Sequence, residues 1–299
     1  MPLTRRALIA GASLLAATAQ PAVAGAGRAF GVLSIEESGA GDPLLLIPGL
    51  ACGAWALDDI ARRLAPRFSI HAMTLPGFDG RPPIAAPMIA RVAADIAAYV
   101  AERRLERPIL VGHSLGAFVA LRAALLRPEQ IGGVVTLDGY PVFPALAGAD
   151  AEARAAAAKR LAEQFAVGAG DPARFRATLR AFLAARMNDP RRADHFAERA
   201  ARSDPGATAA YVVEMLSADL RPELARLTAP LLALAATDSY LAGRADENIS
   251  AFYAGLLADA PKSAVTLLRG SRHFVAVDQP DVVAVAIESF AAGLRLGRA

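Results

Sequence analysis

A serine between two glycines, placed where a strand gives way to a helix, constrains this chain more than any other feature. Pro108–Val111 is a short apolar run of the kind that forms a buried strand. The sequence GHSLG follows at Gly112–Gly116, and a stretch with helical periodicity then runs from Leu115 to Leu126. The two glycines permit a sharp turn, because no Cβ obstructs the backbone there. This context predicts that Ser114 is presented as a nucleophile beside the free N–H groups of a helix start.

Strand-like and helix-like segments alternate on both sides of this turn. Further strands are predicted over Phe30–Glu37, Leu44–Ile47, Phe68–Met73, Gly133–Leu137, Ala229–Ala235 and Ser263–Leu268. Further helices are predicted over Trp55–Leu64, Ile89–Arg104 and Pro280–Leu294. This alternation predicts an α/β fold in which helices cover both faces of a mostly parallel sheet.

The alternation stops after Asp138. Residues 141–227 are rich in Ala and Arg, with helical periodicity and no convincing strand. A segment of this length is too long for a plain connection. We therefore expect a helical cap at 141–227, inserted into one core that is formed by residues 25–140 and 228–299.

The first 24 residues have the pattern of an export signal. Arg5 and Arg6 precede a short apolar stretch, and Ala22–Ala24 ends it with an Ala-x-Ala pattern. The arginine pair is similar to a twin-arginine signal, which predicts cleavage after Ala24 and a periplasmic or secreted protein. The apolar part is shorter than the roughly 20 residues that a bilayer requires, so no stable membrane span is expected after cleavage.

Charge and cysteine content argue against several other classes of protein. The net charge is +3, but the basic residues are scattered among acidic ones, so no nucleic-acid partner is expected. Cys52 is the only cysteine and lacks the neighbouring His or Cys residues of a metal site. We expect neither a metal nor a cofactor.

A serine nucleophile needs a base and an acid that orients the base. His273 follows the last predicted strand and is the predicted base, whereas His71, His113 and His195 are assigned to packing or surface roles. Two carboxylates remain open for the acid. Asp238 follows the strand that ends at Ala235 and is preferred, and Asp138, directly after Leu137, is the alternative.

The reaction also needs two N–H donors for a tetrahedral oxyanion. One is predicted to be the backbone N–H of Leu115, directly after the nucleophile. The second is expected from the loop after Leu44–Ile47, where Leu50 is the first choice and Ala51 the second. Gly49 and Gly53 give this loop the freedom to approach the nucleophile closely.

From about Phe30 to its end, the chain resembles the α/β-hydrolase superfamily. The resemblance rests on Leu46–Leu50, on Gly112–Gly116, on the strand before Asp238 and on Arg272–Phe274. It implies an eight-stranded, mainly parallel sheet, an inserted helical lid and cofactor-free hydrolysis through an acyl-enzyme. Two departures stand out: Pro48 occupies a position where many members have His, and Asp238 comes one residue earlier than expected.

The predicted function is hydrolysis of carboxylic esters with small to medium hydrophobic groups, which the cap would bind. Four aromatic residues of the cap are the candidates for that contact: Phe143, Phe175, Phe182 and Phe196. The same machinery would also serve a lactonase, an amidase or a C–C bond hydrolase, because cap side chains select the leaving group. A non-catalytic ligand-binding protein is the alternative from a different class.

Overall fold

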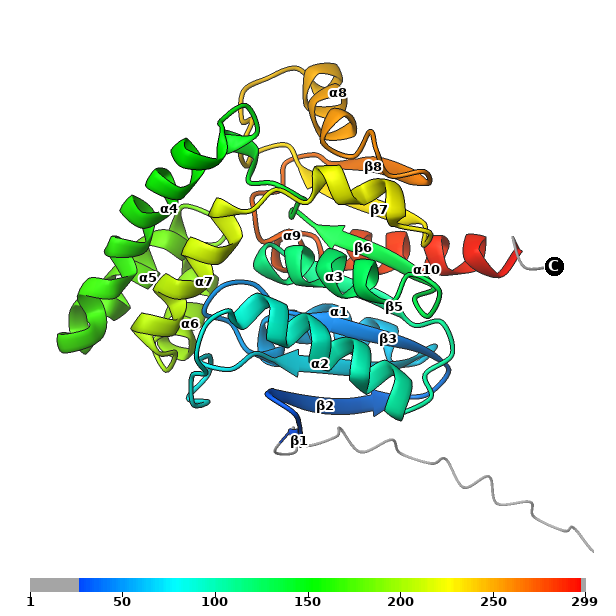
Figure 1. Ribbon diagram of the computed structural model, residues 1–299, viewed down its shortest axis with the longest axis horizontal. Coiled ribbons are helices and arrows are strands. Elements are labelled where there is room, and N and C mark those ends of the chain that lie inside the picture. The colour runs from blue at the N-terminus through cyan, green and yellow to red at the C-terminus, as the bar shows by residue number, and fades with distance from the viewer. Residues whose placement is uncertain (1–26, 297–299) are drawn as a thin grey trace, which may run out of the picture.

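The computed structural model describes residues 27–296, which form one eight-stranded sheet with helices on both faces (Figure 1). The strands are β1 (Arg28–Phe30), β2 (Leu33–Gly39), β3 (Asp42–Ile47), β4 (Phe68–Thr74), β5 (Ile109–His113), β6 (Gly133–Leu137), β7 (Leu231–Ala236) and β8 (Ser263–Leu268). Their order in the sheet is β1-β2-β4-β3-β5-β6-β7-β8. The pairs β1–β2 and β2–β4 are antiparallel, and all the others are parallel. The predicted fold is confirmed.

The two faces of the sheet bury different sets of helices because the side chains of each strand alternate. Leu45 and Ile47 of β3 pack with α2 (Met88–Glu102) and α3 (Leu115–Leu126) on one face. Leu44 and Leu46 pack on the other face with α1 (Asp58–Leu64) and α10 (Pro280–Leu296). Helix α8 (Asp246–Leu256) lies on the first face, where Tyr253 packs with Ala235 of β7.

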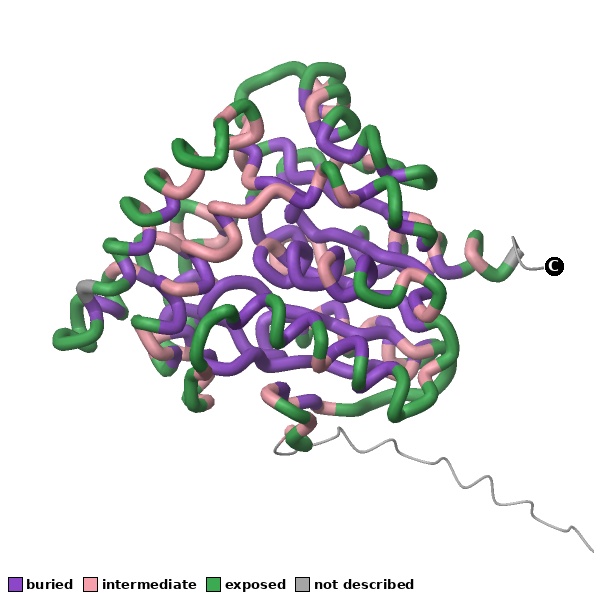
Figure 2. The backbone as a smooth tube through the Cα atoms, viewed as in Figure 1, coloured by how far each residue is buried: buried purple, intermediate pink, exposed green. Residues whose placement is uncertain are grey.

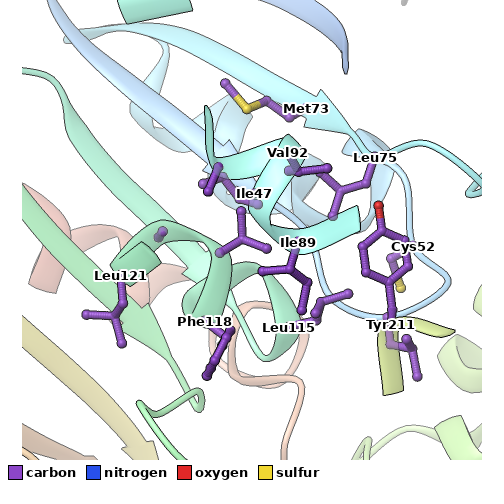
Figure 3. Packing of buried hydrophobic residues seen from close by; sticks show 14 of the residues in the cluster. Ile47, Cys52, Met73, Leu75, Ile89, Val92, Leu115, Phe118, Leu121 and Tyr211 are labelled. Carbon is purple, nitrogen blue, oxygen red and sulfur yellow. The ribbon is translucent and has the colours of Figure 1, made fainter. Parts of the chain in front are cut away.

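Burial follows this layered arrangement. Figure 2 shows that the buried residues are concentrated along the strands and on the inner sides of the helices. In Figure 3, Ile47 of β3 lies among side chains of α2 and α3, including Ile89 and Phe118. The turn between β5 and α3, which carries Ser114, is therefore supported on a tightly packed core.

All described elements between β6 and β7 are helical, and the four α helices among them gather on the left of Figure 1. The α helices are α4 (Ala151–Ala166), α5 (Pro172–Ala184), α6 (Pro190–Ala200) and α7 (Pro205–Ser217). Three of them begin at an Asp-Pro pair, in which the Asp carboxylate accepts a hydrogen bond from an N–H group of the first turn. Proline suits the first helical position because no intrahelical bond needs its missing N–H.

Short helices complete the chain: α9 at Val275–Asp278, and 3₁₀ helices at Ala54–Leu57, Pro144–Leu146, Val167–Gly170 and Arg221–Arg226. The strand predicted over Phe30–Glu37 is two strands, because the backbone turns at Gly31. Helix α8 was not predicted. The export signal predicted over residues 1–24 lies outside the described residues. Within 27–296, no helix has the length and apolar character that crossing a membrane requires.

Candidate active site

Ser114 occupies the turn between β5 and α3 and has an unusual backbone conformation. Its φ is 52° and its ψ is −116°, outside the regions that non-glycine residues favour. Its N–H donates to the carbonyl oxygen of Leu137 on β6, at 3.1 Å. A Cβ on Gly116 would lie 2.1 Å from the carbonyl oxygen of Ile47, so this glycine is what allows the helix to approach the sheet so closely. The predicted turn is present in the structure.

His273 reaches Ser114 from the loop after β8, 159 residues further along the chain. Its Nε2 lies 2.9 Å from Ser114 Oγ, and its Nδ1 lies 2.7 Å from Asp138 Oδ2. A carboxylate only accepts hydrogen bonds, so these partners favour the tautomer with a proton on Nδ1. In that tautomer Nε2 is free to accept the proton of the Ser114 hydroxyl.

Asp138 directly follows β6 and is completely buried. Its Oδ1 accepts hydrogen bonds from the N–H of Ala236, at 3.1 Å, and from the hydroxyl of Tyr140, at 3.0 Å. Its Oδ2 accepts from the hydroxyl of Ser239, at 2.7 Å, as well as from His273. Four donors therefore fix the orientation of this carboxylate, which in turn fixes the His273 ring.

Asp238, the preferred acid of the sequence prediction, does not contact His273. Its side chain is exposed, and its carboxylate accepts a hydrogen bond from the hydroxyl of Thr237, at 3.2 Å. The next residue, Ser239, is the one that reaches the Asp138 carboxylate. The preference for Asp238 is therefore wrong, because the carboxylate beside the candidate base is that of Asp138, the alternative. Ser239 and Tyr140, which hold Asp138, were not predicted.

The loop after β3 lies against Ser114. A Cβ built on Gly49 would be 3.4 Å from Ser114 Cβ. Leu50 follows Gly49, and Leu115 is the first residue of α3, so its N–H has no acceptor within the helix. Among the described residues, neither of these two N–H groups makes a hydrogen bond to another backbone or side-chain atom. The same holds for the N–H of Ala51, the second choice, so Leu50 and Leu115 stay the predicted donors.

None of the other three histidines makes a hydrogen bond to Ser114 Oγ. His113 is buried, its Nε2–H donates to the carbonyl oxygen of His273 at 3.0 Å, and burial lowers the pKa of its ring to about 3. His71 is paired with the hydroxyl of Tyr99 at 2.8 Å, and burial lowers its pKa too. His195 lies exposed on α6 of the cap.

A narrow cavity adjoins Ser114. It measures about 20 Å³, which is room for about one water molecule. Its walls include Phe118, Phe143, Met215 and Tyr240. Of the four aromatic residues named from the sequence, only Phe143 lines it.

The remaining three aromatic residues have other contacts. Phe196 packs edge-on against Trp55 and Phe274 and joins the cap to the core. Phe175 is buried within the hydrophobic core. Phe182 lies beneath the guanidinium of Arg186.

Within residues 27–296, no group of three or more His, Cys, Asp and Glu side chains is arranged to hold a metal ion. The chemistry that this arrangement can perform is nucleophilic, because the hydroxyl, imidazole and carboxylate form a continuous chain of hydrogen bonds.

The mostly parallel sheet, the serine turn and the Ser114–His273–Asp138 array together define a hydrolase of the serine type. The chain belongs to the alpha/beta hydrolase family, whose model matches residues 44–286. This membership confirms the resemblance inferred from the sequence motifs.

Two curated relatives are pimeloyl-[acyl-carrier protein] methyl ester esterases. The one from Aeromonas hydrophila is 29% identical over 86% of this chain and 98% of its own length. The one from Yersinia enterocolitica is 26% identical over 85% of this chain and 95% of its own length. Among solved structures, a thermophilic esterase from Thermogutta terrifontis superposes with a TM-score of 0.73 at 20% identity, covering 88% of this chain and 93% of that one. At this identity the structural likeness shows the fold alone.

Proposed function

We propose that this protein hydrolyses carboxylic esters through an acyl-enzyme formed on Ser114. The observation that carries the proposal is the unbroken line of contacts from Ser114 Oγ to His273 Nε2, and from His273 Nδ1 to Asp138. Ser114 Oγ attacks the ester carbonyl while His273 accepts its proton. Asp138 holds the required tautomer and stabilises the imidazolium that forms. His273 then gives the proton to the departing alcohol, and water releases the acid by the same route.

The tetrahedral intermediate carries a negative charge that the N–H groups of Leu50 and Leu115 are proposed to stabilise. Loss of one such donor from a site of this type costs about 3 kcal/mol. Because both donors belong to the backbone, side-chain substitution does not remove them. Their contribution depends instead on the close approach of Gly49 to Ser114.

The proposed substrates are esters whose group next to Ser114 is small. The narrow cavity beside the hydroxyl supports this size limit, and its walls are mainly apolar. The two relatives described above are named for methyl ester hydrolysis, which supports a small alcohol as the leaving group.

Replacement of Ser114 tests the mechanism directly. Ser114→Ala is expected to lower kcat for p-nitrophenyl acetate by about 10⁴-fold or more, as removal of a nucleophile does in comparable triads. A fluorophosphonate probe is expected to label the wild-type protein at Ser114 and to leave the variant unlabelled. Full turnover by the variant would refute the mechanism. A panel of esters, lactones and anilides would then identify the bond that is cleaved.

We also propose that the protein is exported with cleavage after Ala24. The support is the arginine pair and the Ala-x-Ala ending in the sequence. N-terminal sequencing of the mature protein is expected to start at Gly25. Replacement of Arg5 and Arg6 by Lys is expected to leave the full-length chain in the cytoplasm, and unchanged export of that variant would contradict a twin-arginine route.

A further inference from the structure

Arg186 is a cationic side chain at the border between the cap and the loop that carries His273. It lies in the turn after α5, and its carbonyl oxygen accepts a hydrogen bond from the N–H of Phe274, at 3.1 Å. Because Phe274 directly follows His273, this bond fixes Arg186 next to the candidate base. No carboxylate of residues 27–296 lies within 4.0 Å of its guanidinium nitrogens.

The guanidinium belongs to a half-buried residue and makes few polar contacts with the protein. Its carbon lies 3.8 Å from the centre of the Phe182 ring, and Nη1 donates to the Phe182 carbonyl oxygen at 3.0 Å. An arginine has five N–H donors, so most of them have no protein acceptor here. Burial lowers the pKa of Arg186, which reflects the loss of water around the charge. An anion placed against the free donors would offset that loss.

Arg186 lines space that the candidate base also lines. A cavity of about 210 Å³ is lined by Arg186, Tyr240 and His273, together with Asp238 and Ser239. Arg186 also lines a second cavity, of about 570 Å³, between α4 and α5 of the cap. A substrate held at His273 therefore has room to extend to the guanidinium.

The other charges around these cavities determine where an anion would bind. Asp238 lines the first cavity and would repel an anion that approached it there. Its carboxylate is exposed to water and accepts a hydrogen bond from Thr237, so this repulsion acts only close to Asp238. The second cavity carries Arg160 and Arg174 in addition to Arg186, against the single carboxylate of Glu163. An anion is therefore drawn toward Arg186 and away from Asp238.

We propose that Arg186 binds a carboxylate that the substrate carries, so that the preferred substrates are monoesters of short dicarboxylic acids. The ester carbonyl would lie at Ser114 and the free carboxylate would pair with the guanidinium fork, a geometry that arginine is suited to provide. This inference rests on the proposed ester hydrolysis and adds the substrate class.

The test compares two methyl esters of the same shape. Monomethyl glutarate carries the carboxylate, and methyl 5-methylhexanoate replaces it with an isopropyl group. We expect the wild-type protein to favour monomethyl glutarate in kcat/KM. Arg186→Gln is expected to lower the ratio of the two kcat/KM values by about ten-fold or more, the effect of losing a charged hydrogen bond. Arg186→Lys, which keeps the charge, is expected to give an intermediate ratio.

Arg191→Gln serves as the matched control, since Arg191 lies in the same cap with its side chain 92% exposed. Its ratio is expected to equal that of the wild type. Calorimetric titration with free glutarate supplies a readout that does not need turnover, and we expect binding to the wild type and much weaker binding to Arg186→Gln.

An unchanged ratio in Arg186→Gln would overturn the carboxylate site. If that unchanged ratio comes with equal losses on both esters, Arg186 only supports the fold. Failure of the proposed function looks different. In that case p-nitrophenyl acetate is not hydrolysed and Ser114 is not labelled, whatever the response to glutarate.

Discussion

Replacement of Asp138 by Asn retains the size of the side chain but changes two of its four acceptor sites into donors. The amide oxygen must face either the N–H of Ala236 or the Nδ1 of His273. The backbone N–H cannot become an acceptor, whereas the His273 ring can change tautomer, and the hydroxyls of Tyr140 and Ser239 can rotate. The amide is therefore expected to keep its oxygen toward Ala236 and to present its NH₂ to His273.

This orientation leaves the proton of His273 on Nε2, where it faces Ser114 and prevents the ring from acting as a base. The corresponding change in a serine protease lowers kcat by about 10⁴-fold. We expect Asp138→Asn to lower kcat/KM for p-nitrophenyl acetate by about 10³- to 10⁴-fold, or about 4–5.5 kcal/mol. Asp238→Asn is expected to change it by less than about three-fold, because Asp238 is exposed and does not contact His273.

Initial rates for both variants, with thermal unfolding midpoints measured beside them, check this expectation. The midpoint separates loss of chemistry from loss of fold. The reasoning is refuted if Asp138→Asn folds and keeps more than a tenth of the wild-type kcat/KM, or if Asp238→Asn proves the more damaging change.

Three further predictions follow from the packing and the buried histidine. Met215→Ala is expected to widen the cavity beside Ser114 and to raise kcat/KM for p-nitrophenyl hexanoate, relative to the acetate, by about ten-fold; an unchanged ratio would show that Met215 does not set the size limit. Gly116→Ala is expected to lower the free energy of unfolding by about 3 kcal/mol, because the new Cβ meets the Ile47 carbonyl; a loss under about 0.5 kcal/mol in denaturant titrations would contradict this. The pKa of His113 is lowered from 6.5 to about 3 in the folded protein. Between these two pH values the unfolded chain binds a proton at His113 that the folded chain does not. This residue therefore lowers the free energy of unfolding by about 1.4 kcal/mol for each pH unit of acidification. His113→Asn should remove that slope and His195→Asn, at an exposed site, should retain it.

Most of the fold and two members of the candidate triad could be predicted from the sequence because they depend on local patterns. Short apolar runs predicted the central strands, and the predicted bounds of Gly133–Leu137 and Ser263–Leu268 equal the observed ones. Ser114 is identified by the glycines around it. His273 is identified by its place after the last strand, since loops at that end of parallel strands converge.

The acid could not be predicted because two carboxylates follow neighbouring parallel strands at the same edge of the sheet. Leu137 and Leu234 lie side by side in the β6–β7 pair, so Asp138 and Asp238 both emerge near His273. The direction of one side chain decides between them. The φ of Asp138 is 44°, a conformation that asparagine and aspartate adopt more readily than most residues, and no local pattern predicts it.

The substrate contacts of the cap were also beyond the sequence. An aromatic residue on a cap helix contributes equally well to packing and to binding, and Phe196 and Phe143 illustrate the two outcomes. Arg186 gave no signal because the chain contains many arginines, and only its position beside Phe274 distinguishes it.

The attachment of Asp138 to β6 has a consequence for how such an enzyme can diversify. Strands β5 and β6 are direct neighbours, so one ladder of backbone hydrogen bonds sets the separation of Ser114 and Asp138. The segment after β7 then contributes only the Ser239 hydroxyl to the array. Its remaining residues, from Tyr240 to Ala245, are open to exchange by evolution or in a library. New substrate preferences could arise there while the reacting groups stay in register.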